Sequence, residues 1–211
     1  MLALCALVFL VSAGLLLWYY QGAGREAGQL RQLAALKAQA DEKQTDAAPE
    51  ESSSPLGATG LETLAAQNPD LAGWITIEGT NIDYPVMQRD MQFYLRHDFE
   101  GAPSKMGLPF ADVRCDVADG EQNLVIYAHN MNSGAMFRDL LRLQQPEYLA
   151  RHSRIRLETL AETREYQVSS TLSFNDGELT EDIYANEGLL VLITCTNQTE
   201  TGRFAVFAKR I

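Results

Sequence analysis

From Trp74 to the C-terminus the chain is divided into short apolar or alternating segments that are separated by turn residues. The alternation in WITIEG and NIDYPVMQ, on either side of residues 79–81, predicts a β-hairpin. Within residues 61–211, helical patterns fit only LETLAA and residues 135–143 and 147–152. Many short strands with so few helices favour a mostly β fold, a closed or nearly closed β-barrel, over a parallel α/β sheet. The further strands are expected at residues 108–110, 123–127, 154–158, 165–174, 189–195 and 204–209.

The first twenty residues, MLALCALVFLVSAGLLLWYY, carry no charged side chain. As a helix they would reach about 30 Å, the thickness of a bilayer's hydrocarbon core, and the aromatic residues 18–20 suit the membrane interface. A cleaved secretory signal is the competing interpretation, but the apolar stretch is longer than a signal core and no basic residue precedes it. We expect residues 1–20 to form a transmembrane anchor. The basic residues that follow would by themselves favour a cytoplasmic body, so charge leaves the orientation open.

The segments after the anchor differ sharply in composition. Residues 21–43 are rich in helix formers, with Leu30, Leu33 and Leu36 near one side, and predict a helical stalk. Residues 44–60 are mostly Ser, Pro, Glu and Ala, which predicts a flexible linker. Residues 61–211 are long enough to bury a core of their own and form the predicted β-barrel domain.

The charge and the cysteines exclude several classes of protein. The net charge is −11, and a body this acidic would be repelled by a phosphate backbone, so no nucleic-acid partner is expected. No CxxC motif or Cys/His cluster has the spacing of a zinc site, so neither a metal nor a cofactor is expected.

Two predicted strands end in residues that could carry chemistry. NLVIYAHNMNSG is an apolar strand that delivers His129 to the beginning of a loop, where a rigid sheet can present a proton-transfer group. LLVLITC is a nearly continuous apolar run that delivers Cys195 to its end. Each residue alone could also be structural, the histidine as a satisfied polar group and the thiol as a small buried side chain.

Arg203 would face Cys195 across a hairpin, because the polar segment TNQTETG joins LLVLITC to the alternating strand RFAVFAKR. A fixed cation near a thiol lowers the thiol pKa and so raises the fraction of nucleophilic thiolate. A guanidinium could also bind the oxyanion that forms when a thiolate adds to an amide. The three polar side chains at strand ends thus predict a site for covalent catalysis.

With these residues assembled, the chain from Leu61 to Ile211 resembles a class B sortase, a membrane-anchored cysteine transpeptidase of Gram-positive bacteria. The matching segments are NPDLAGWITIEGTNIDYPVMQ, DMQFYLRHDFEG, MGLPFADVR, YAHNMNSGAMFRDL, and LITC followed by GRF. The family usually has glycine where this chain has Ala128, and the first position of its pattern before the cysteine is Val191 here. The segment 175–188 is short for the family, which predicts a shorter wall beside the substrate groove.

The resemblance implies a catalytic triad of His129, Cys195 and Arg203 in a sortase-type barrel. It implies substrates that are surface proteins with a C-terminal sorting motif of the NPxTN or SPxTG type, cleaved after threonine through a thioester. The acceptor would be an amine of a peptidoglycan precursor or of a pilin, and the enzyme would be a single-pass protein of the cell membrane with an extracellular catalytic domain. The implied substrate-binding residues are Leu95, Ile193 and Thr194, together with Met91, which stands where the family has an asparagine near the groove.

Two other interpretations stay open. The chain could be a cysteine protease of another type, although the papain-like form expects its cysteine before its histidine. It could also be a non-enzymatic β-domain anchored at the cell surface, in which Cys195 is merely buried.

Overall fold

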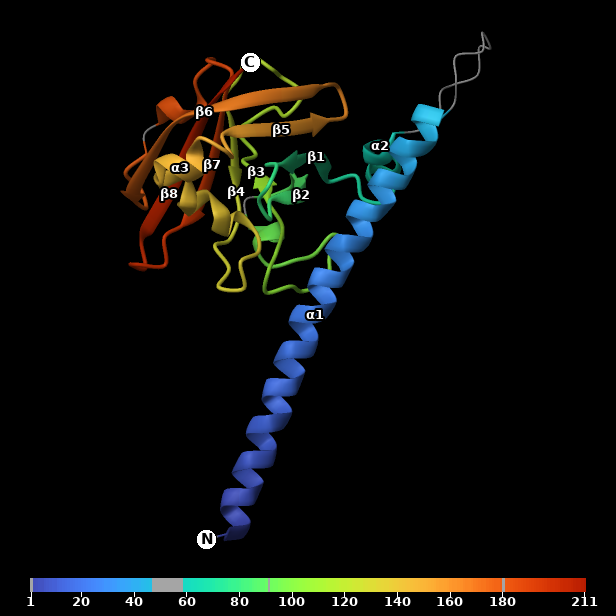
Figure 1. Cartoon of the computed structure of the whole chain (residues 1–211), viewed down its shortest axis with the longest axis vertical. Helices are drawn as coiled ribbons and strands as arrows, with labels where there is room; N and C mark the ends of the chain where they lie inside the picture. Colours follow the sequence, from blue (N-terminus) through green and yellow to red (C-terminus); the bar gives the residue numbers. More distant parts are fainter. Residues whose placement is uncertain (1, 47–58, 91, 180) are drawn as a thin grey trace.

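The structure is a computed structural model that describes residues 2–46, 59–90, 92–179 and 181–211 (Figure 1). Most of the predicted linker, residues 44–60, lies outside the described residues, and so does the predicted substrate contact Met91.

The strands of the described residues close into a barrel in the order β1-β2-β3-β4-β7-β8-β6-β5. The prediction of a mostly β fold with a closed barrel is therefore confirmed. The strands are β1 Leu71–Thr76, β2 Asp83–Met87, β3 Phe110–Ala111, β4 Leu124–Tyr127, β5 Arg154–Thr159, β6 Thr163–Asn175, β7 Leu189–Cys195 and β8 Gly202–Arg210.

Both predicted hairpins are present, since β1 pairs antiparallel with β2 and β7 pairs antiparallel with β8. Between these two antiparallel hairpins the pairing is of another kind, because β4 and β7 are neighbours that run parallel to each other. Residues 190–194 of β7 are all buried, as expected of a strand that is covered on both faces. The apolar run before Cys195 is thus explained by its place in the middle of the sheet.

Short helices connect the strands. Helix α2, Gly60–Ala65, begins with a capping box: the Thr59 side chain accepts the N–H of Glu62, and the Glu62 carboxylate accepts the N–H of Thr59. Helix α3, Pro146–Leu149, has proline in its first turn, where no intrahelical N–H bond is lost. The remaining turns are 3₁₀ helices, η1 Phe93–Leu95, η2 Phe137–Gln144 and η3 Glu181–Tyr184.

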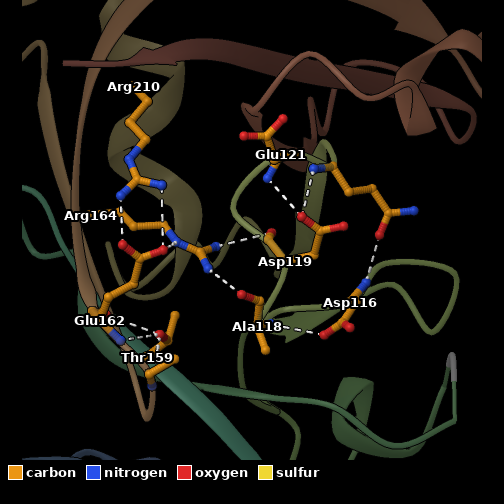
Figure 2. A network of polar contacts seen from close by, with 10 residues as sticks. Asp116, Ala118, Asp119, Glu121, Thr159, Glu162, Arg164 and Arg210 are labelled. Carbon is orange, nitrogen blue, oxygen red and sulfur yellow. Dashed lines mark hydrogen bonds and ion pairs between the residues drawn. The ribbon is translucent and has the colours of Figure 1, made fainter.

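A buried arginine ties the β3–β4 loop to the strands at one edge of the barrel (Figure 2). The Arg164 side chain is 1% exposed and donates to the Glu162 carboxylate at 2.7 Å and to the carbonyl of Ala118 at 2.9 Å. Arg210 of β8 contacts the same carboxylate at 2.6 Å. A charge this deeply buried is tolerated only when it is paired and hydrogen-bonded, so the network fixes the loop that leads into β4.

Helix α1, Leu2–Asp46, includes both the predicted anchor and the predicted stalk. Figure 1 shows that its second half lies along the barrel beside α2, while its first half extends away from the barrel. Leu33 is 8% exposed and belongs to the hydrophobic core. Lys37 forms an ion pair with Glu158 of β5 at 2.7 Å and lies over the Trp74 ring. Of the stalk leucines, Leu30 and Leu33 therefore pack against the domain, whereas Leu36 is exposed.

Among the residues that the structure describes, no helix combines the length and the hydropathy that crossing a bilayer requires. The anchor at residues 1–20 stays a prediction.

Candidate active site

The parallel pair β4 and β7 brings the histidine and the cysteine to the same edge of the barrel. Tyr127 is paired with Ile193, and the Ala128 N–H continues the ladder to the Ile193 carbonyl at 3.1 Å. Extending this register by two residues places His129 level with Cys195. The Thr194 hydroxyl donates to the Ala128 carbonyl at 2.8 Å, which holds the two strand ends together.

His129 is half-buried and is held from two sides. Its Nε2 donates to the Leu95 carbonyl of η1 at 2.9 Å, and its own carbonyl accepts the Phe137 N–H at 2.9 Å. Because a carbonyl oxygen can only accept, Nε2 carries a proton in this contact. Nδ1 is the ring nitrogen without a hydrogen bond to the described residues, and it is therefore the nitrogen available for proton transfer.

Cys195 is a free, half-buried thiol at the last position of β7. The Asn130 side chain donates to the Cys195 carbonyl at 2.9 Å and so fixes the backbone next to the sulfur. The other described cysteine of the barrel, Cys115, is also free but buried, and burial raises the pKa of its thiol. These two thiols are not joined in a disulfide.

Arg203 is the residue of β8 that is directly paired with Cys195. Its Nη1 donates to the carbonyls of Glu200 and Gly202 at 3.3 and 3.1 Å, and its Nη2 donates to the Asp176 carboxylate at 2.9 Å. Residues directly opposite in an antiparallel pair have Cβ atoms about 5 Å apart. The structure thus brings the three predicted catalytic residues together at adjoining strand ends.

A pocket of about 150 Å³ lies beside Arg203 and is lined on one side by the segment between β6 and β7. This segment is short and contains only the single turn η3 among its described residues. Apolar and aromatic side chains of the barrel wall, Tyr127, Phe174 and Ile193, also line the pocket. The pocket is small and partly apolar, and the cation of Arg203 is part of its lining. Such a pocket can hold part of an extended peptide.

A buried carboxylate anchors this short segment to the barrel. The Asp112 side chain is fully buried and accepts hydrogen bonds from Arg114 Nε at 3.0 Å and from the Tyr184 hydroxyl of η3 at 2.8 Å. Arg114 also contacts the Tyr184 hydroxyl, and its guanidinium lies over the Tyr184 ring. Burial, together with the neighbours Tyr127 and Asp112, raises the pKa of Tyr184, so this hydroxyl remains a donor.

The predicted substrate-binding residues have different surroundings. Ile193 lines the pocket, although its side chain is 2% exposed. Thr194 is buried and its hydroxyl is engaged by Ala128. Leu95 is half-buried and packs on the core next to His129. Their roles toward a substrate stay predictions.

Sequence reasoning missed the polar residues that support the site, namely Asp176, Asp112, Arg114 and Tyr184. Asp176 stands in the turn sequence NDGE, which reads as a solvated loop. Arg114 and Asp112 follow a two-residue strand, so no periodic pattern marks them. The available signals were the two opposite charges immediately after an apolar segment and the place of both residues in the matching segment MGLPFADVR.

A family model described as the sortase domain matches residues 75–211. Sortase B of Listeria monocytogenes is 38% identical over 93 residues, which cover 44% of this chain and 38% of that protein. Sortase B of Staphylococcus aureus is 30% identical over 111 residues, which cover 52% of this chain and 46% of that protein. The chain thus matches less than half the length of these curated relatives.

Solved structures show the same fold. The structure of Clostridium perfringens sortase B matches with a TM-score of 0.62 and 26% identity, over 71% of this chain and 98% of that one. The Staphylococcus aureus sortase B-substrate complex matches with a TM-score of 0.74 and 21% identity, over 90% of this chain and 98% of that one.

Because the family model matches more than half of the chain, the chain belongs to the sortase family. Within that family, the relatives and structural neighbours named above are sortases of class B, in agreement with the resemblance of the sequence motifs.

Proposed function

We propose that this chain cleaves a C-terminal sorting motif of the NPxTN or SPxTG type after its threonine and transfers the acyl part to an amine. The observation that carries the proposal is the convergence of His129, Cys195 and Arg203 at neighbouring strand ends of the barrel. A nucleophile, a proton donor and an oxyanion ligand are the parts that acyl transfer through a thioester requires.

In the first half of the reaction, the Cys195 thiolate attacks the carbonyl carbon of the motif's threonine. A carbon–sulfur bond forms, and the guanidinium of Arg203 binds the negatively charged carbonyl oxygen. When the carbon–nitrogen bond breaks, protonated His129 gives its proton to the leaving amine. The products of this half are a thioester on Cys195 and a free C-terminal peptide.

In the second half, the acceptor amine attacks the thioester carbonyl and loses a proton to His129. Arg203 binds the oxyanion again, the carbon–sulfur bond breaks, and Cys195 leaves as a thiolate. The new amide joins the threonine to the acceptor. Each group returns to its starting protonation state, so one residue acts as acid and then as base.

The pocket beside Arg203 is the proposed place for the residues that precede the threonine. Ile193, Leu95 and Thr194 are the proposed groove residues, and the segment between β6 and β7 is the proposed wall. Tyr184 supports that wall through its hydrogen bond to Asp112. A short wall leaves fewer contacts with the first motif position, which is consistent with relaxed selection there.

The proposed partners are surface proteins that carry a sorting motif, with a peptidoglycan precursor or a pilin as the source of the amine. The proposed location is the cell membrane, with one spanning helix and the catalytic domain outside the cell. The uncharged residues 1–20 are the support for the anchor.

The test uses the purified full chain in detergent with a library of fluorescent peptides that contain NPxTN-like and SPxTG-like motifs. We expect cleavage after threonine and, when a glycine or lysine amine is added, a transfer product that mass spectrometry identifies. Cys195→Ala should lose all turnover, because no other group in the site can form the thioester.

Cys115→Ala is the matched control, since it removes the other thiol of the barrel and should keep turnover. Normal rates in Cys195→Ala, or loss of turnover in Cys115→Ala alone, would end the proposal. Cleavage that gives hydrolysis products at every amine concentration would instead favour a cysteine protease of another type.

A further inference from the structure

The guanidinium of Arg203 donates hydrogen bonds to three acceptors of the protein. Two backbone carbonyls, those of Glu200 and Gly202, accept from Nη1, and the Asp176 carboxylate accepts from Nη2. Asp176 provides the shortest of these contacts, 2.9 Å, and the only charged partner among the described residues. Nε makes no hydrogen bond to the described residues, so at least one donor of the fork is left for a substrate oxygen.

A built turn presents Asp176 to this arginine. Asn175 is the last residue of β6 and is paired with Gly202, and the Asp176 N–H donates to the Thr201 carbonyl at 2.8 Å. The turn is closed by Glu178, whose carboxylate accepts the N–H of Asn175 at 2.7 Å and its side-chain amide at 2.9 Å. These hydrogen bonds lower the pKa of Glu178, which therefore stays ionised and keeps the turn closed at neutral pH.

The chain direction changes at Gly177, the residue between the two carboxylates. Its φ is +84°, a conformation that other residues adopt at a cost. The turn can therefore follow β6 directly. As a result, the Asp176 carboxylate lies beside β8, which a longer connection would not ensure.

The contact contributes to orientation more than to stability. The Asp176 side chain is 65% exposed and that of Arg203 is 23% exposed, and ion pairs this accessible add little to the free energy of folding. Orientation matters more, because an oxyanion ligand is effective only when its donors already point to the place where the charge will develop. Without Asp176, only Nη1 would be held by hydrogen bonds. The guanidinium plane could then rotate about the Cδ–Nε bond of Arg203.

We propose that Asp176 is a positioning residue that fixes the plane of the Arg203 guanidinium for catalysis. The proposal rests on the transpeptidase function proposed above. It assigns to the short segment after β6 a role in the acid, base and oxyanion chemistry, in addition to its place in the wall of the pocket.

The kinetic test compares Asp176→Asn, Asp176→Glu and the control Glu187→Gln in the full chain. The substrate is the library peptide that the native chain cleaves fastest. Glu187 is an exposed carboxylate of the same segment, so its loss makes the same change of net charge away from Arg203. We expect Asp176→Asn to lower kcat by about 10- to 100-fold with little change in KM or in Tm. Asp176→Glu should recover part of the lost kcat. In a chain that already carries Arg203→Lys, adding Asp176→Asn should lower kcat little further.

A second readout needs no peptide and so separates this proposal from the proposed function. Phenylglyoxal modifies guanidinium groups, and mass spectrometry can follow its reaction with Arg203. We expect phenylglyoxal to modify Arg203 faster in the Asp176→Asn variant than in the chain without a substitution or in the Glu187→Gln variant. Equal modification rates would overturn the proposal even if the peptide is cleaved, and so would a kcat in Asp176→Asn that is unchanged or higher.

Discussion

Cys195 and Cys115 differ in their exposure to solvent. Cys195 is half-buried at a strand end, whereas Cys115 is 5% exposed and its thiol pKa is raised by burial. Iodoacetamide reacts with the thiolate, so at neutral pH it should modify Cys195 first and Cys115 only after unfolding. Peptide mapping after brief exposure to the reagent measures the order. Modification of Cys115 at the same rate or earlier would contradict the assignment of Cys195 as the nucleophile.

Asp112 should make the folded state sensitive to acid. Burial works to raise the pKa of its carboxyl, but the hydrogen bonds from Arg114 and Tyr184 outweigh it and hold the pKa below its ordinary value. A lowered pKa means that the ionised carboxylate contributes stability above about pH 4, and that this contribution is lost as the pH falls further. Urea unfolding between pH 7 and pH 3 measures the effect.

Asp112→Asn should lower the free energy of unfolding at pH 7 by about 3 kcal/mol, because Arg114 and Tyr184 lose a charged acceptor. The loss should shrink as the pH falls below about 4, because the unfolded chain then binds a proton that the native carboxylate does not bind. Glu121→Gln, an exposed acid of the same loop, is the control and should change stability by less than about 0.5 kcal/mol. A constant difference between Asp112→Asn and the native chain across this pH range would contradict the argument.

At the scale of the elements, α1 is part of the folded domain rather than only a connection to it. Leu33 is 8% exposed in the core, while Leu36, one turn further along the same helix, is 36% exposed. Leu33→Ala should therefore lower the free energy of unfolding by about 2 to 3 kcal/mol, and Leu36→Ala by less than about 1 kcal/mol. Equal effects of the two substitutions in urea unfolding would show that α1 does not pack on the domain in solution.

The strands could be predicted from the sequence because the pattern that reveals them is local. Alternation marks β1, β2, β5 and β8, and continuous apolar runs mark β4 and β7. The single-turn helices η1 and η3 have no repeat and were missed. The parallel pairing of β4 with β7 is a contact between distant segments, and no local pattern encodes which strands become neighbours.

The same distinction holds for the site in the whole molecule. His129, Cys195 and Arg203 could be predicted because each follows or begins a strand that is visible in the sequence. Asp176 could not, because it meets Arg203 from 27 residues away in the chain and only the closure of the barrel brings β6 beside β8. The groups that are proposed to act on a substrate are thus marked by local context, whereas the groups that hold them are not.

The parallel pairing of β4 with β7 also determines when the polypeptide becomes chemically competent. Ala128 and Thr194, whose hydrogen bond joins the two strand ends, are 66 residues apart in sequence. Pairing over such a separation requires a long loop to close before any contact compensates for the lost entropy, and it is slow. Until that step is complete, the imidazole and the sulfur belong to separate parts of an unfolded coil. A partly folded polypeptide therefore carries only an ordinary thiol, and under the proposed function its reactivity toward amides is acquired only with the finished barrel.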